Sequence, residues 1–150
     1  MTLQIVIGVA VDAAGAAIAA VLRRRAPAGP PRDAYPVPRQ LARADFPRPD
    51  APWLVAYFSS ETCDSCQTLG PKVAALEAPD VVACEIEFSV GRMVHERYEI
   101  AAIPMILVAD ADGVVLRAFV GATSATDLWA AVAEAREPGS TPESGLGLLA

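Results

Sequence analysis

The sequence predicts an α/β domain in which helices flank a mixed central β-sheet, preceded by an N-terminal transmembrane helix and a Pro-rich linker. Strand-like and helix-like stretches alternate between residues 53 and 137. A Cys-x-x-Cys motif stands between the first such strand and the first helix. An apolar stretch with a single charge opens the chain. The length of 150 residues leaves room for one domain with extensions.

The first half of the domain reads as strand, helix, strand and helix. Trp53–Ser59 is a continuous apolar run that predicts a buried strand, and Cys66–Ala78 predicts the following helix. Val81–Phe88 alternates apolar and polar positions with the period of a strand. Arg92–Tyr98 predicts a short helix. A strand, a crossover helix and a second strand favour parallel pairing.

The second half predicts a hairpin and a closing helix. Met105–Ala109 and Val114–Val120 are apolar strands, and Asp110–Gly113 between them has the composition of a hairpin turn. Ser124 is a suitable N-cap for a helix over Ala125–Glu137. The hairpin adds antiparallel strands to the parallel pair, so we expect a mixed sheet.

The N-terminal segment 1–22 is predicted to be a hydrophobic transmembrane helix. Its core, residues 3–22, is twenty residues long with one charge, Asp12. A helix of that length spans about 30 Å, the thickness of the hydrocarbon layer. The central Asp12 makes insertion only marginally favourable, because its cost nearly offsets the apolar contributions. A first helix buried against a partner in a cytosolic protein is the competing interpretation.

Charges after this segment predict its orientation. Arg23–Arg25 follow it directly and no basic residue precedes it. The positive-inside rule then places the rest of the chain in the cytoplasm, with an extracytoplasmic domain as the alternative. Gly15 and Ala19 form a small-x-x-x-small pair that favours a homodimer through this helix. The expected localisation is a single-pass membrane protein.

Proline content sets the remaining boundaries. Residues 23–52 hold eight of the thirteen prolines, which is typical of an extended, semi-rigid linker. We assign 23–49 to an Arg/Pro-rich linker, in which residues 39–45 could fold as a short first element. Residues 50–137 form the domain, and the Gly/Ser/Pro-rich residues 138–150 form a flexible tail.

Charge and cysteine content exclude two classes of protein. Residues 1–50 carry seven Arg against four acids, whereas residues 51–150 carry five basic residues against fourteen acids. The domain has no basic patch, so nucleic acid is not an expected partner. Three cysteines are too few for a disulfide-stapled scaffold, and one is left over after pairing.

Cys63 and Cys66 are the candidate catalytic residues. A thiol at a helix N-terminus has its thiolate stabilised by the helix dipole and by free backbone N–H groups. A Cys-x-x-Cys between a strand and a helix therefore indicates a redox site. A zinc site of Cys63, Cys66, Cys84 and His95 is chemically reasonable. We expect no metal, because Cys84 lies mid-strand on an apolar face and no second paired motif brings ligands together. Cys84 is predicted to lie in the core and His95 on a solvated helix face.

The order of these motifs resembles the thioredoxin superfamily over residues 50–137. No single motif is specific to this superfamily, but the whole set of motifs in this order is specific to it. The matching features are the Cys63–Cys66 pair, Pro71 in the following helix, Ile103-Pro104, Asp112-Gly113 in the last hairpin, and Val120-Gly121.

The resemblance implies roles for individual residues. Cys63 would attack and form a mixed disulfide, and Cys66 would resolve it. Ile103 and Pro104 would bind the substrate, with Pro104 preceded by a cis peptide bond that leaves neighbouring backbone free to pair with an extended chain. No cofactor is implied beyond the redox-active disulfide. The implied partners are protein thiol or disulfide substrates and an upstream electron donor or acceptor.

The sequence departs from the family pattern around the cysteines. Thr62 replaces the usual Trp, Asp64-Ser65 replaces Gly-Pro, and Tyr57 replaces a buried Asp used in proton transfer. These departures favour a specialised thiol–disulfide oxidoreductase, acting as a reductant if the domain is cytoplasmic. Two alternatives are a redox-inactive binding or scaffold module, and a relative of the membrane-tethered thioredoxin-like proteins of cofactor and cytochrome maturation.

Overall fold

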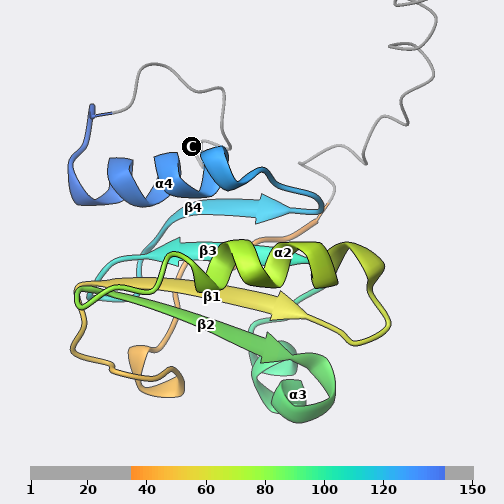
Figure 1. Cartoon of the computed structure of the whole chain (residues 1–150). Coiled ribbons are helices and arrows are strands. Elements are labelled where there is room, and N and C mark those ends of the chain that lie inside the picture. The colour runs from red at the N-terminus through yellow and green to blue at the C-terminus, as the bar shows by residue number, and fades with distance from the viewer. Residues whose placement is uncertain (1–34, 141–150) are drawn as a thin grey trace, which may run out of the picture. The chain divides into compact units, whose positions relative to one another are not determined.

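The computed structural model describes residues 35–140, which form four strands and three α-helices with a short 3-10 turn before them (Figure 1). In chain order the elements are η2 (Arg43–Asp45), β1 (Trp53–Ser59), α2 (Asp64–Ala74), β2 (Val81–Glu87), α3 (Phe88–Arg97), β3 (Met105–Ala109), β4 (Val115–Val120) and α4 (Ala125–Arg136).

The sheet is mixed, as the sequence predicts. Its strand order is β2-β1-β3-β4. β1 pairs in parallel with β2, from Trp53 opposite Val81 to Ser59 opposite Glu87. β3 runs antiparallel to both β1 and β4. β1 is thus a central strand, and all but its first residue are buried.

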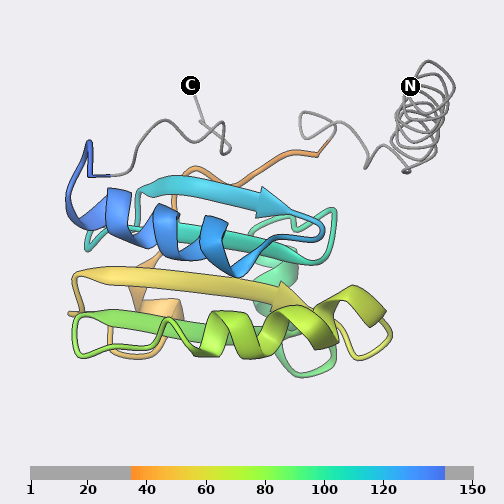
Figure 2. The ribbon, with the colours of Figure 1, turned by 45° about the horizontal axis from the view of Figure 1, so that its top comes forward.

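Alternate residues of β1 face two different core layers. Val55 and Tyr57 face the layer that includes Leu69 of α2 and Leu128 of α4. Both views show α2 and α4 over this same face of the sheet (Figures 1 and 2). The opposite face packs against α3 and the segment before β1, and its layer contains Leu41, Phe46, Leu54, Ala56, Phe58, Met105 and Leu107.

Packing on the sheet begins before residue 50, within the segment assigned to the linker. Leu41 and Phe46 are buried, and η2 lies in the stretch 39–45 where a short element was expected. Leu41 N–H donates to the Gly113 carbonyl at 2.8 Å. A Cβ on Gly113 would lie 1.9 Å from the Leu41 oxygen, so this close approach requires glycine.

Helix α2 begins and ends earlier than the predicted Cys66–Ala78. Its N-cap is Cys63, and Asp64 lies in the first turn, where the helix dipole favours a negative charge. After Ala74 the chain turns so that Ala78 can pair with Val81. That pairing starts β2, and it is why the helix ends before Ala78.

Helix α3 also starts earlier than predicted, at Phe88 instead of Arg92. The Glu87 side chain accepts hydrogen bonds from Ser89 N–H at 2.7 Å and Val90 N–H at 3.3 Å, which caps the helix and ends β2 one residue before the predicted Phe88. At Gly91 the backbone leaves helical geometry. A Cβ there would lie 2.4 Å from the Ile86 side chain, so only glycine fits.

The prediction that His95 lies on a solvated face is wrong. His95 is 3% exposed, and its ring makes edge contacts with Phe58 and Phe88. Its Nε2 lies 2.8 Å from the Ile86 carbonyl oxygen. The two aromatic neighbours come from β1 and the start of α3, and the pattern of α3 by itself does not show them. Cys84 is half-buried against the same core layer.

The predicted transmembrane helix, residues 3–22, lies outside the described residues. Among residues 35–140, no helix is both long enough and apolar enough to cross a membrane. Ser124 caps α4 as predicted, because its side chain accepts from Asp127 N–H at 3.1 Å.

Candidate redox site

Three chain segments meet at one end of the sheet. The chain leaves β1 at Ser59 and reaches Cys63 after a short loop. β3 enters with Met105, which is paired with Phe58 of β1 and with Val120, the last residue of β4. Pro104 and Gly121 therefore lie at the same end as the Cys63 loop. Gly121 N–H donates to the Pro104 carbonyl at 2.8 Å, which joins the two segments.

Both predicted substrate-binding residues lie in this arrangement. The Ile103–Pro104 peptide bond is cis. Pro104 is buried, whereas the Ile103 side chain is 38% exposed. At this end of the sheet an exposed apolar side chain thus stands directly before a buried proline.

Cys63 and Cys66 form a disulfide with their Cα atoms 5.3 Å apart. Cys63 is half-buried at the N-cap of α2, and Cys66 is only 4% exposed. Cys66 faces inward because it shares the buried stripe of α2 with Leu69 and Val73. The sulfur nearer solvent is thus Cys63, at the helix N-terminus, where the dipole favours a thiolate.

Tyr57 both packs in the core and contacts the thiol site. It is fully buried, and its hydroxyl donates to the Cys66 carbonyl at 2.8 Å. Burial, helped by the nearby charge of Glu85, raises the pKa of Tyr57 to about 12. The phenol therefore stays protonated at neutral pH, so it positions the Cys66 backbone and does not act as a base.

Ser65, which the sequence analysis treated only as a departure from the family pattern, is a neighbour of the Cys63 sulfur. Its Oγ lies 3.4 Å from Cys63 Sγ. A hydroxyl at this distance can donate to a thiolate once the disulfide is reduced. This contact could have been predicted from the sequence, because Ser65 stands two residues after Cys63, in the first turn of α2.

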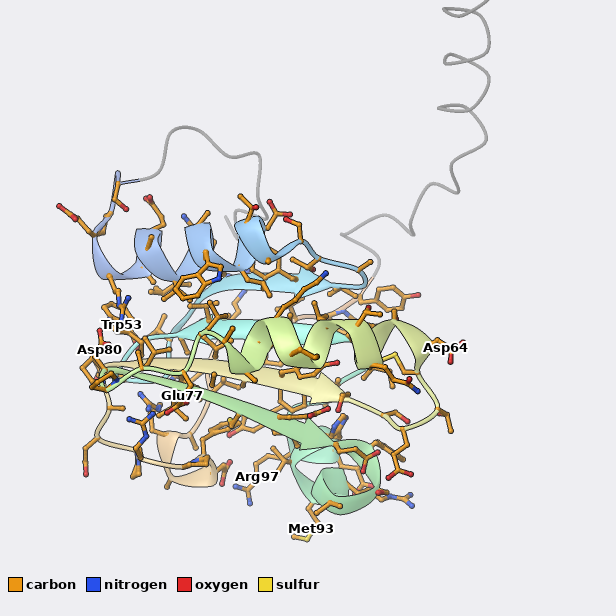
Figure 3. The ribbon with its side chains drawn as sticks, in the orientation of Figure 1. Trp53, Asp64, Glu77, Asp80, Met93 and Arg97 are labelled. Carbon is orange, nitrogen blue, oxygen red and sulfur yellow. A yellow bond between two sulfur atoms is a disulfide. The ribbon has the colours of Figure 1, made fainter. Side chains whose placement is uncertain are left out.

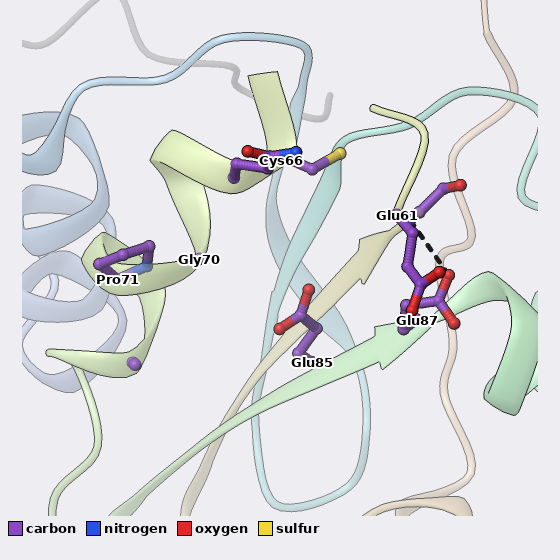
Figure 4. A pocket seen from close by; sticks show the side chains of 9 residues that line it. Glu61, Cys66, Gly70, Pro71, Glu85 and Glu87 are labelled. Carbon is purple, nitrogen blue, oxygen red and sulfur yellow. Dashed lines mark hydrogen bonds between the residues drawn. The ribbon is translucent and has the colours of Figure 1, made fainter. Parts of the chain in front are cut away.

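Three carboxylates surround a cavity beside Cys66 (Figure 4). The cavity has a volume of about 370 Å³, and its walls include Glu61 from the loop before Cys63 and Glu85 and Glu87 from β2. Sequence reasoning missed Glu85 and Glu87. Their position could have been predicted from β2, because side chains alternate between the two faces of a strand. Glu85 and Glu87 therefore lie on the face opposite to Cys84 and Ile86.

Glu87 joins the redox loop to α3. Besides capping α3, its carboxylate accepts from Glu61 N–H at 3.2 Å. These hydrogen bonds, led by that from the Ser89 hydroxyl, lower the pKa of Glu87 below its usual value. Glu85 is held by the buried Ser59, whose Oγ donates to its carboxylate at 2.5 Å. Both carboxylates are therefore oriented by neutral donors.

The other titratable candidates do not join the site. Cys84 is a free thiol, and burial is the main cause that raises its pKa to about 11. His95 is bonded to Ile86 in the core. Within residues 35–140, no group of three or more His, Cys, Asp or Glu side chains is placed to hold a metal ion.

Comparisons with known proteins identify the family. Residues 40–136 match the family described as a thioredoxin-like domain. A thioredoxin from Fasciola hepatica is 25% identical, with a TM-score of 0.50, 57% of this chain covered and 83% of that chain. A mutant thioredoxin from Halobacterium salinarum NRC-1 is 23% identical, with a TM-score of 0.50 and coverage of 62% and 80%. A search of curated proteins found no significant match.

The family match includes the Cys63–Cys66 pair and spans all four strands of the sheet. It confirms the resemblance that the motif order indicates. At a general level, a thioredoxin-like domain with such a disulfide supports thiol–disulfide exchange. The chain belongs to the thioredoxin superfamily.

Proposed function

We propose that this protein is a thiol–disulfide oxidoreductase that reduces protein disulfides, with Cys63 as nucleophile and Cys66 as resolving thiol. The observation that carries the proposal is the Cys63–Cys66 disulfide at the N-terminus of α2, with Cys63 the more exposed sulfur. Its position at the same sheet end as the Pro104 loop supports access by a polypeptide.

The reaction proceeds in two exchanges. The Cys63 thiolate attacks one sulfur of a substrate disulfide, which forms a mixed disulfide and releases one substrate thiolate that takes a proton from solvent. Cys66, deprotonated, then attacks Cys63 Sγ and releases the second substrate thiol. One substrate disulfide is reduced to two thiols, and the protein dithiol is oxidised to a disulfide. A dithiol reductant restores the protein by the reverse exchange.

Substrate contact is assigned to the Ile103–Pro104 segment. Pro104 has no N–H, and Ile103 exposes an apolar side chain beside the site. An extended substrate segment can pair with free backbone groups there and place its disulfide against Cys63. This contact favours polypeptides over small disulfides.

Turnover of insulin with dithiothreitol tests the activity. The wild-type chain is expected to accelerate insulin reduction, and Cys63→Ser to lose the acceleration. Cys84→Ser is the matched control and is expected to keep it, because Cys84 is outside the site. Loss of turnover in Cys84→Ser, or its retention in Cys63→Ser, would contradict the assignment.

The direction of electron flow is tested by the reduction potential of the Cys63–Cys66 pair. We propose a reductant, so a value near the thioredoxin level of about -270 mV is expected. A value near about -120 mV would make the protein an oxidant instead.

A binding module without redox turnover is the second candidate. Tyr57 at the position of the family's buried Asp favours it, because a phenol with a pKa of about 12 takes no proton from Cys66. Partner capture with Cys66→Ser separates the two. A reductant retains partners as mixed disulfides that dithiothreitol releases, whereas a binding module retains them equally in the Cys63→Ser variant.

We further propose that residues 3–22 anchor the protein in a membrane, with Arg23–Arg25 and the domain in the cytoplasm. The apolar segment and the arginines directly after it support this orientation. The full chain is expected in the membrane fraction after alkaline extraction, and the variant Val9→Arg/Ile18→Arg in the soluble fraction. Protease added to intact cells should leave the domain uncut, and its cleavage there would indicate the opposite orientation.

The pair Gly15 and Ala19 supports a homodimer through the same helix. Crosslinking of the full chain in membranes is expected to give a dimer that Gly15→Leu weakens. An unchanged dimer in Gly15→Leu would place the contact elsewhere.

A further inference from the structure

We propose that the redox site selects cationic substrates, namely protein disulfides with lysine or arginine next to the reacting cysteine. The inference rests on the proposed function, because it concerns the substrates of the same disulfide. It follows from the position of three carboxylates in the walls of the cavity beside Cys66.

The carboxylates come from two separate segments that meet at the resolving cysteine. Figure 4 shows Glu61 beside Glu87, with Glu85 earlier on β2, below the turn of α2 that carries Cys66. Glu61 and Glu85 are exposed to solvent, and the cavity they border is wide enough, at about 370 Å³, to take a lysine or arginine side chain. Asp64, directly after Cys63, is also exposed but does not line the cavity.

No basic residue lines this cavity. The nearest cations along the chain have other partners. Lys72 of α2 donates to the Thr123 carbonyl at 3.3 Å. Arg92 pairs with Glu96 on α3, and the Arg97 guanidinium pairs with Asp45. None of these cations lines the cavity, so its carboxylates have no ion-pair partner among the lining residues.

The local donors orient the carboxylates without cancelling their charge. Glu85 accepts from the Ser59 hydroxyl, and Glu87 accepts from backbone N–H groups and the Ser89 hydroxyl. These donors are neutral, so they add no positive charge to the cavity, and the hydrogen bonds to Glu87 lower its pKa. Because like-charged groups across an interface disfavour association, an anionic substrate is excluded by the same feature that attracts a cationic one.

Small disulfides of different charge test this selection without requiring a known protein substrate. The probes are cystamine, which carries two ammonium groups, neutral hydroxyethyl disulfide, and dithiodiglycolate, which carries two carboxylates. The fully reduced chain, freed of reductant in nonionic detergent, reacts in a single turnover. Each turnover reduces one probe to two thiols and oxidises the protein to the Cys63–Cys66 disulfide.

The measured quantity is the rate for each probe divided by its rate with dithiothreitol, which removes differences in intrinsic reactivity. The expected order is cystamine, hydroxyethyl disulfide, dithiodiglycolate. We expect cystamine to exceed dithiodiglycolate by about tenfold or more at an ionic strength of about 0.01 M, where the screening length is about 30 Å. The ratio should fall to about twofold near 1 M, where that length is about 3 Å.

The double variant Glu61→Gln/Glu85→Gln tests whether these carboxylates cause the preference. It is expected to lower the cystamine-to-dithiodiglycolate ratio by about threefold or more at low salt. A ratio between probes cancels any effect of the substitutions on thiolate formation, which changes all three rates alike. Glu87 is left intact because it caps α3.

Asp112→Asn is the matched control, since it removes one exposed charge from the β3–β4 turn. That turn lies at the opposite end of the sheet, because Ala109 pairs with Leu54 while Met105 pairs with Phe58. The control is expected to keep the wild-type ratio.

The outcomes separate this inference from the proposed function. The inference is overturned if hydroxyethyl disulfide is reduced but the three normalised rates do not follow the charge of the probes. It is also overturned if the double variant keeps the wild-type ratio of rates. Either result leaves the redox function standing. Absence of turnover with all three probes overturns the inference, whereas the redox function is decided separately by the insulin assay, which offers a polypeptide substrate.

Discussion

The two ends of the sheet differ in what their charged side chains bind. At the end where β1 and β2 begin, arginines bind backbone carbonyls. Arg43 donates to Ala51 at 2.8 Å and to Asp110 at 3.1 Å, and Arg48 donates to Val81 at 2.8 Å. Figure 3 shows Glu77 and Asp80 at that end and Asp64 at the other.

At the redox end the charged groups are carboxylates around a cavity, beside a disulfide. Arginines at the first end donate to carbonyl groups of the turns there, several of which also accept a backbone N–H, and they join the segment before β1 to these turns. Polar contacts that stabilise the fold and groups that can react thus lie at different ends. Substitutions at the first end should change stability and leave the chemistry intact, whereas those at the second can change stability, chemistry or both.

Replacing Arg43 should give the largest change in stability. Arg43 is 8% exposed, and its guanidinium donates to three carbonyl oxygens, those of Ala51, Asp110 and Arg48. Arg43→Ala removes three hydrogen bonds, although the Asp110 and Arg48 oxygens keep the N–H donors of Gly113 and Ala51, and should lower the free energy of unfolding by about 3 kcal/mol. Urea denaturation measures the change.

The control is Arg92→Ala, which breaks an exposed ion pair with Glu96 and should cost less than about 0.5 kcal/mol. The insulin reduction rate of Arg43→Ala, measured at a temperature where it is folded, should match wild type. A large loss of activity in the folded variant would show that the two ends are coupled.

Cys84 lies between the two ends and should be unreactive. With Cys63 and Cys66 joined as a disulfide, it is the only free thiol, and burial raises its pKa to about 11. At about pH 8, iodoacetamide should label it about a hundredfold more slowly in the native protein than in urea, because the thiolate is the reactive form. Equal rates in the two states would place a reactive thiol outside the redox end.

Tyr57→Phe tests the part played by the phenol at the redox end. The variant loses the hydrogen bond to the Cys66 carbonyl and should unfold more easily by about 1 kcal/mol. Since the pKa of Tyr57 is about 12, its hydroxyl does not titrate near neutral pH. The pH dependence of insulin reduction between about pH 6 and about pH 9 should therefore be unchanged. A shifted profile would assign proton transfer to the phenol.

Glu87→Gln should have the smallest effect, and it should depend on pH. Hydrogen bonds lower the pKa of Glu87 below 4.5, so the folded state favours its ionised form. The stability that this adds is present above the unfolded pKa and is lost as pH falls through the folded pKa. The difference in urea midpoint between wild type and variant should be greatest at neutral pH and decrease under acid. A difference that grows in acid would contradict this assignment.

Patterns local in sequence predicted most of the fold. The alternation of strands and helices was enough for a parallel pair followed by a hairpin, and the structure confirms both. The Cys63–Cys66 spacing predicted a pair that could close a disulfide at a helix N-terminus. These features follow from side-chain periodicity, turn chemistry and short covalent reach, all of which act within a few residues.

Contacts between distant segments were decided only by the tertiary structure. Burial of His95 needs Phe58 from β1, and the packing of Leu41 needs the close approach of Gly113. The acidic cavity needs β2 to lie beside β1, so that Glu85 and Glu87 reach the loop after Ser59. By itself the sequence determined the elements and the reactive pair. Its charges took on their roles only when folding brought separate strands and loops together, because electrostatic and packing energies depend on distance in space.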